Sequence, residues 1–135
     1  GDINEITMIT RKPPASLLGA PHLVNNQIDV SALKEPLKVF SGSAREGAAG
    51  FPANVNVAAA LGLAGIGADH TNLEIWADPN ATRNTHSIRV DSAEARLEMK
   101  IENVPTEENP ATGKLTALSV IACLRGLVAP LKVGS

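Results

Sequence analysis

The chain has 135 residues, 44% of them hydrophobic, and a formal net charge of −2 at neutral pH. This length and composition suit one domain with a buried core, residues 1–135, and no cluster of lysines and arginines indicates a nucleic-acid partner. The single cysteine, Cys123, excludes a disulfide framework within one chain and leads us to expect a reducing cytoplasm.

Two strands are predicted in the first third of the chain, on either side of a long loop. Residues 5–10 alternate polar and apolar side chains and are rich in β-branched residues, which indicates a strand with one buried face. Residues 37–42 are a second strand candidate. Prolines, a glycine and asparagines interrupt residues 11–36, so we expect a functional loop there, in which Ser31 can cap a short helix.

Two helices are predicted next. Residues 44–49 favour one helical turn before a proline. Residues 53–64 are small and apolar, with Asn54 at the N-cap position and Gly65 or Gly67 as the stop. Their alanine and glycine content predicts a helix that another backbone can approach closely.

Strand patterns return in the second half of the chain. Residues 71–77 and 85–90 alternate on either side of the turn-forming residues 78–80, so we expect two paired antiparallel strands. Residues 93–102 show the cleanest alternation, which predicts a strand with one apolar and one charged face.

A final helix is predicted over residues 114–129, with Thr112 as its N-cap. It is apolar nearly all round, which favours burial on more than one side, for example by another subunit or domain. The apolar segment 115–131 contains Arg125 and Pro130 and is shorter than the roughly 20 apolar residues of a membrane span, so we expect no membrane partner.

These elements predict an α+β fold with a mixed, largely antiparallel sheet and helices packed on one face. The glycine-rich phosphate-binding pattern of a Rossmann domain is absent from the sequence, because residues 42–50 have the wrong spacing and Gly65 follows a helix instead of opening one. No Walker-type loop, cysteine pair or His-x-x-x-His pattern appears either, so no metal site is predicted.

His86 is the most informative single residue. The alternation of its strand places it on the same face as Ile88 and Val90, beside a loop. A titratable ring on a buried face suits a catalytic acid or base, but on residue type alone a core histidine bonded to a backbone carbonyl is the more common case.

Asn54 and Asn56 flank the start of the second predicted helix, where free N–H groups favour an electron-rich ligand group. One amide can cap the helix while the other reaches outward to a carboxamide, or both can be capping residues only.

Several cations lie near loop and strand junctions and can hold a substrate carboxylate: Arg11, Lys12, Arg83 and Lys114. Solvated surface is the ordinary place for such residues. Thr112 and Lys114 gain weight because a helix N-terminus also attracts anions.

Three motifs together resemble the L-aspartate dehydrogenase family. They are FPANVNVAAA at residues 51–60, ADP at 77–79 followed by NTH at 84–86, and NPATGKLTALS at 109–119. The segment TRKPP at residues 10–14 is similar too, so the resemblance extends over residues 5–127. In that family this region is the C-terminal α+β domain.

The resemblance implies an NAD- or NADP-dependent oxidation of L-aspartate, with water, to oxaloacetate and ammonia through iminosuccinate. It implies that His86 is the active-site histidine and that Asn56 binds the cofactor. Lys12, Asn84, Thr112 and Lys114 are weaker candidates for the substrate carboxylates. The chain begins at Gly1 rather than methionine, as if in the middle of a protein. The resemblance implies an N-terminal Rossmann domain of the same protein as a partner, and a homodimer.

Two alternatives to this function stay open. The chain can be a non-catalytic dimerisation or binding module of the same fold, or part of a dehydrogenase that acts on another amino or imino acid.

Overall fold

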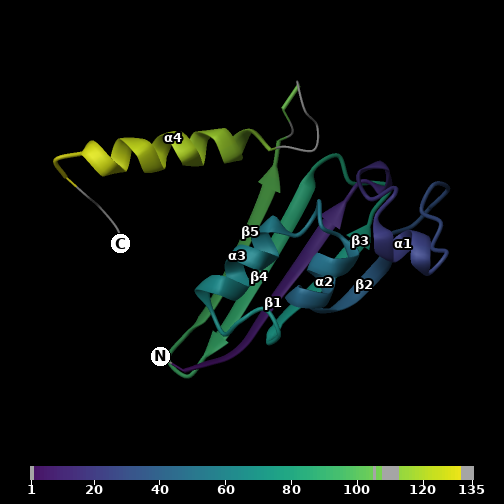
Figure 1. Ribbon diagram of the computed structural model, residues 1–135, viewed down its shortest axis with the longest axis horizontal. Helices are drawn as coiled ribbons and strands as arrows, with labels where there is room; N and C mark the ends of the chain where they lie inside the picture. Colours follow the sequence, from purple (N-terminus) through teal and green to yellow (C-terminus); the bar gives the residue numbers. More distant parts are fainter. Residues whose placement is uncertain (1, 105, 108–112, 132–135) are drawn as a thin grey trace. The chain divides into compact units, whose positions relative to one another are not determined.

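A five-stranded mixed sheet organises the first of two units in the chain (Figure 1). The computed structural model describes residues 2–104, 106–107 and 113–131. The two units are Gly1–Glu102 and Asn103–Ser135.

The sheet has the strand order β2-β3-β1-β4-β5. Its central strand β1 (Ile3–Lys12) pairs in parallel with β3 (Thr71–Ala77) and antiparallel with β4 (Asn84–Ser92). Strand β2 (Leu37–Ser43) pairs antiparallel with β3, and β5 (Arg96–Asn103) lies beyond β4. The predicted α+β class with a mixed sheet is confirmed, as are the strands expected at these places.

The predicted pairing of residues 71–77 with 85–90 is wrong. Strand β1 lies between β3 and β4 and pairs with both, so that Thr10 is opposite Ile75 on one side and His86 on the other. Alternation identifies a strand but not its neighbour, and a parallel pair needs a long crossover connection rather than a turn. Here that connection holds three helices and β2.

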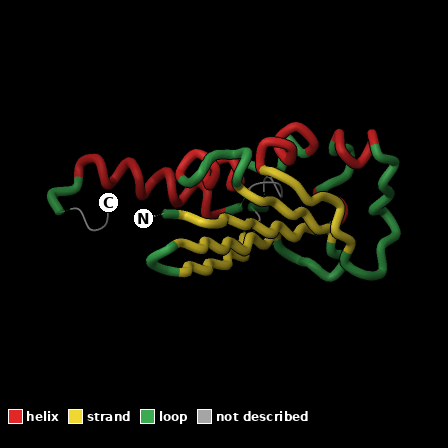
Figure 2. Tube along the Cα trace, turned by 90° about the horizontal axis from the view of Figure 1, so that it is seen from below, coloured by secondary structure: helices red, strands yellow, loops and turns green. Residues whose placement is uncertain are grey.

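Three short helices cover one face of the sheet (Figure 2). They are α1 (Pro21–Asn25), α2 (Ala44–Gly50) and α3 (Asn56–Ala64), and a 3-10 turn, η1 (Pro14–Ser16), follows β1. On β1 every second side chain from Ile6 to Lys12 is buried on this face. The helices therefore exclude solvent from this face of β1.

Helix α2 follows β2 directly and packs close to the sheet. Its N-terminus carries a reciprocal capping box, in which the Ser43 hydroxyl accepts from the Glu46 N–H and the Glu46 carboxylate accepts from the Ser43 N–H. A side chain at Gly47 would place its Cβ 2.5 Å from Leu73 of β3. Glycine at this position thus permits the close approach of α2 to the sheet.

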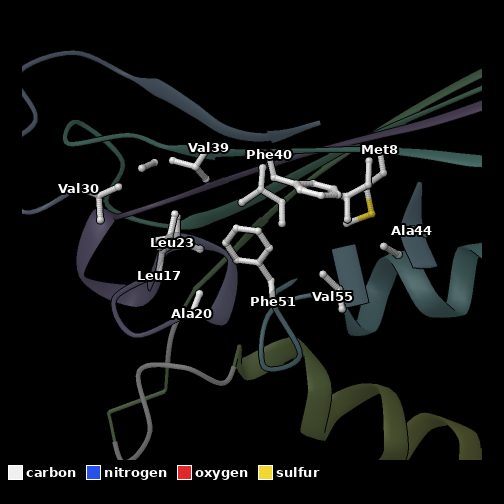
Figure 3. Close-up of a cluster of buried hydrophobic side chains, with 14 of the residues drawn as sticks. Met8, Leu17, Ala20, Leu23, Val30, Val39, Phe40, Ala44, Phe51 and Val55 are labelled. Carbon is white, nitrogen blue, oxygen red and sulfur yellow. The ribbon is translucent and has the colours of Figure 1, made fainter. Parts of the chain in front are cut away.

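Phe51 lies at the centre of the core, between the helices and the sheet (Figure 3). It is fully buried, and its ring lies 5.7 Å from that of Phe40 in an edge-on arrangement. Met8 of β1 and Leu17 and Leu23 of the following segment belong to the same cluster.

Three local predictions are corrected. Ser31 caps no helix; its backbone N–H donates to the Asp29 carboxylate in a turn, and the helix in that loop is α1. Helix α3 begins at Asn56 instead of residue 53, and its N-cap is Val55, whose side chain makes no capping bond, instead of Asn54. It ends at Gly65, as expected.

The second unit contains the helix α4 (Lys114–Val128), as predicted, but its N-cap is Gly113 rather than Thr112. No residue of α4 is buried by the residues that the structure describes, and its apolar side chains and Cys123 are exposed. Leu97 and Met99 of β5 are also exposed, so the predicted apolar face of that strand is not covered by described residues. Among the described residues, no helix is long and apolar enough to cross a membrane.

The core predicts a large stability difference between two substitutions. Phe51→Ala should lower the free energy of unfolding of the sheet unit by about 3–5 kcal/mol. The substitution removes buried apolar surface and leaves a cavity that the neighbouring side chains fill only in part. Leu63→Ala, at a side chain that is 89% exposed on α3, should change it by less than about 0.5 kcal/mol. Urea titration followed by the fluorescence of Trp76, the single tryptophan, measures both. A loss below about 1 kcal/mol for Phe51→Ala would show that Phe51 does not hold this core.

Candidate active site

His86 lies on the covered face of the sheet and is held there by a neighbouring strand. It is directly opposite Thr10 in the antiparallel ladder of β1 and β4, and its side chain is 6% exposed. Its Nδ1 is 3.1 Å from the Thr10 hydroxyl oxygen, and Thr10 is itself buried. The ring is therefore bonded to a side chain, not to the backbone carbonyl that a core histidine commonly uses.

Lys12 lies two residues beyond Thr10 on the same face of β1 and is also buried. Its ammonium group donates a hydrogen bond of 2.6 Å to the side-chain oxygen of Asn54. Asn54 belongs to the turn before α3, where its N–H donates to the Phe51 carbonyl. The turn thus connects the core to the buried lysine.

Burial and charge act together on these two titratable groups. Burial lowers the pKa of Lys12 to about 8. Burial, and then the positive charge of Lys12, lowers the pKa of His86 to about 4. At pH 7 the site therefore holds a neutral imidazole beside a protonated amine. Within the described part of the chain, no carboxylate forms an ion pair with Lys12.

A buried ammonium without a counter-ion favours an anionic ligand. Each charge removed from water carries a desolvation cost that a bound carboxylate can offset. The neutral imidazole can take or give a proton next to that anion. This combination of a cation and an acid–base group on one buried face suits a reaction on a carboxylic acid.

Two other predicted residues lie in the same unit. Asn84 is the first residue of β4, two positions before His86 and so on the same strand face, and it is half-buried. Asn56 is the first residue of α3 and is exposed. Because no side chain caps α3, its first N–H groups and the Asn56 amide fit a carbonyl-type ligand group such as a carboxamide.

Three further candidates lie elsewhere in the sequence. Arg11 points to the opposite face of β1, where its guanidinium lies 4.6 Å from the Trp76 ring centroid and 3.8 Å from the Asp78 carboxylate. Lys114 is the exposed first residue of α4 in the second unit, and its N–H donates to the Val104 carbonyl. Thr112 lies outside the described residues.

Thr10 and the contact of Asn54 with Lys12 were missed by sequence reasoning. A threonine in a strand is an ordinary β-former, so nothing in the local sequence distinguishes Thr10. Only the register of β1 against β4 shows that its hydroxyl meets His86. Asn54 was read as a helix cap because it precedes a helix, whereas its side chain binds Lys12.

Comparison with known proteins finds one family over almost the whole chain. The family model described as "Aspartate dehydrogenase, C-terminal" matches residues 1–127. The L-aspartate dehydrogenase of Bradyrhizobium diazoefficiens is 58% identical over 135 residues, which are 100% of this chain and 48% of that protein. L-aspartate dehydrogenase 3 of Bordetella bronchiseptica is 56% identical over 100% of this chain and 49% of its own length.

A solved structure agrees with these relatives. The crystal structure of aspartate dehydrogenase from Thermotoga maritima matches with a TM-score of 0.74 and 31% identity, over 98% of this chain and 48% of that chain. The chain therefore spans about half the length of the relatives that it matches.

The electrostatics of the site yield a prediction about His86. In Lys12→Met the repulsion from the ammonium group disappears while burial remains, so the pKa of His86 should rise from about 4 toward its ordinary value of 6.5. Lys38→Met is the matched control, because Lys38 is an exposed lysine that is ion-paired with Glu74 at 3.2 Å. A pH titration of the His86 ring by NMR measures the change, and an equal pKa in Lys12→Met and the unaltered chain would rule out the coupling.

Proposed function

This chain belongs to the aspartate dehydrogenase family, and we propose that it is the catalytic domain of an NAD- or NADP-dependent L-aspartate dehydrogenase. The observation that carries the proposal is the buried pair of His86 and Lys12 on one face of the sheet: a neutral imidazole and an ammonium group that has no carboxylate partner among the described residues. The reaction converts L-aspartate, water and oxidised NAD or NADP to oxaloacetate, ammonia and NADH or NADPH through iminosuccinate. It takes place in the cytoplasm, where an exposed free thiol such as Cys123 stays reduced.

His86 acts as the general acid and base. A neutral imidazole takes a proton from the water molecule whose oxygen attacks the imine carbon of iminosuccinate, and it returns a proton to the nitrogen that leaves as ammonia. Its lowered pKa keeps the ring neutral at pH 7, so the form that accepts the first proton is the resting form.

Lys12 holds a carboxylate of the substrate. Its ammonium group is fixed by Asn54 and has no carboxylate partner among the described residues, so a substrate carboxylate supplies the missing counter-charge. Asn84, at the start of β4, is the second candidate in this unit. Lys114, the first residue of α4, and Thr112, which lies outside the described residues, are further candidates from the sequence.

Asn56 and the start of α3 hold the nicotinamide carboxamide. The nicotinamide, when bound, accepts the hydride that leaves the α-carbon of aspartate. The phosphates need a glycine-rich loop, and residues 1–135 contain none with the required spacing. We therefore assign phosphate binding to an N-terminal Rossmann domain of the same protein.

A homodimer accounts for the exposed apolar side chains of α4. Its exposed leucines, isoleucine and valines are Leu115, Leu118, Val120, Ile121, Leu124, Leu127 and Val128. Apolar side chains of this number on one helix are typical of an interface. The same observation supports the second candidate function, a dimerisation or binding module without catalysis.

Substitution of His86 separates the two candidate functions. In the protein that carries this chain together with its Rossmann domain, His86→Ala should lower kcat by roughly 10²–10⁴, the usual loss for a general acid and base, and leave the dissociation constant of NAD unchanged. His70→Ala, at an exposed loop histidine, is the control and should keep full turnover. Steady-state kinetics and cofactor titration measure both, and unchanged turnover in His86→Ala would remove the catalytic assignment.

Asn56→Ala should weaken the binding of NAD more than it lowers kcat, the reverse of His86→Ala. The loss of one amide contact should weaken NAD binding about tenfold, with a smaller effect on kcat once the cofactor is saturating. Asn4→Ala, at an exposed asparagine of β1, is the matched control. An unaltered dissociation constant in Asn56→Ala would exclude the carboxamide contact.

The 135 residues alone should show no dehydrogenase activity with L-aspartate and NAD or NADP. Joining them to a Rossmann domain should restore it, because that domain supplies the phosphate contacts. Turnover by the isolated chain in a spectrophotometric NADH assay would refute the assignment of phosphate binding to the Rossmann domain.

A further inference from the structure

We propose that Thr10 is a positioning residue, whose hydroxyl fixes the ring of His86 by its Nδ1 and leaves Nε2 to face the reactant. This inference rests on the proposed function, since it concerns the same histidine. It adds a residue that the family resemblance did not supply.

The contact is built into the sheet. Thr10 and His86 are directly opposed in the antiparallel ladder, and their side chains emerge on the same covered face. Both strands belong to the interior of the sheet, with β1 between β3 and β4, and β4 between β1 and β5. The hydroxyl therefore has little freedom to move away from the ring, and the Oγ1 to Nδ1 distance of 3.1 Å is that of a hydrogen bond.

The bond leaves one ring nitrogen for chemistry. Among the described residues, Thr10 is the one hydrogen-bond partner of the His86 side chain, and it engages Nδ1. Nε2 makes no hydrogen bond to any residue that the structure describes. A histidine held through Nδ1 presents Nε2 at its other end, where it can accept or donate a proton.

A hydroxyl suits this position because it can both accept and donate. When Nε2 is the base, Nδ1 carries the hydrogen and donates it to Thr10 Oγ1. When Nε2 has gained a proton, the same Nδ1–H bond persists, so protonation does not require the ring to turn. When Nε2 alone carries hydrogen, the hydroxyl rotates and donates to Nδ1.

The absence of charge on Thr10 distinguishes it from a carboxylate partner. A carboxylate would stabilise the imidazolium form and raise the pKa of the ring. Thr10 gives orientation without that stabilisation, and the nearby Lys12 disfavours the charged ring further. The His86 ring is therefore kept neutral while the Thr10 hydroxyl fixes its orientation.

Kinetics of the protein that carries its Rossmann domain provide the first test. Thr10→Val keeps the shape of the side chain and removes the hydroxyl, so kcat should fall about tenfold or more, as expected for the loss of one hydrogen bond that orients a reacting group. KM for L-aspartate and the dissociation constant of NAD should change less than about threefold. Thr10→Ser should recover most of the lost kcat.

Thr71→Val is the matched control. Thr71 is fully buried on the neighbouring strand β3, and its hydroxyl donates to the Gly67 carbonyl rather than to His86. Thr71→Val therefore loses a buried hydroxyl in the same sheet, and its kcat should stay near that of the unaltered enzyme.

Nitrogen-15 NMR of the 135-residue chain provides a test that needs no turnover. Thr10→Val should change the Nδ1 and Nε2 shifts of His86, which report the tautomer, while the signals of His22 and His70 stay in place and serve as internal references. Thr71→Val should leave all three histidines unchanged.

The outcomes distinguish the positioning role of Thr10 from the proposed function of His86. Altered His86 shifts together with reduced kcat in Thr10→Val, rescued in Thr10→Ser, support the positioning role. Unaltered shifts, unaltered kcat, or equal losses in Thr10→Val and Thr71→Val would overturn it. Full turnover in His86→Ala would instead remove the proposed function, whatever the NMR spectrum of Thr10→Val shows.

Discussion

The antiparallel register of β1 against β4 is the constraint on which the site depends. It sets Thr10 opposite His86 and leaves Lys12 two residues further along the same face. A slip of one residue in β1 would turn Thr10 and Lys12 to the other face and bring Arg11 inward. The three helices that cover this face, and the core around Phe51, oppose such a slip because they bury Ile6 and Met8 on it as well.

Burial of two basic side chains on one face has a cost that the fold alone does not explain. Lys12 and His86 are both removed from water, and no described carboxylate pairs with the lysine. A structural role would be served as well by apolar side chains of similar size. Strongly perturbed basic groups that share one buried face are typical of a site that binds an anion and moves a proton.

The elements and the face of His86 could be predicted from the sequence, whereas the partners of the strands could not. Alternation over residues 5–10 and 85–90 identifies β1 and β4 and places His86 inward, because that pattern is local. The insertion of β1 between β3 and β4 depends on a long crossover, which no local pattern encodes. The contacts of Thr10 and Asn54 could not be predicted for the same reason, since their partners His86 and Lys12 are 76 and 42 residues away. The apolar composition of α4 could be predicted from the sequence, but its burial could not, because none of its side chains is buried by the described residues.

A crystal structure of the complete protein with a nicotinamide cofactor and an unreactive dicarboxylate in place of aspartate would test the proposed site in one measurement. We expect one carboxylate within about 3 Å of the Lys12 ammonium, His86 Nε2 facing the ligand with Nδ1 still on Thr10, and the carboxamide at Asn56. A dicarboxylate bound away from Lys12 and His86, or a ring that has turned its Nδ1 from Thr10 to the ligand, would exclude this arrangement.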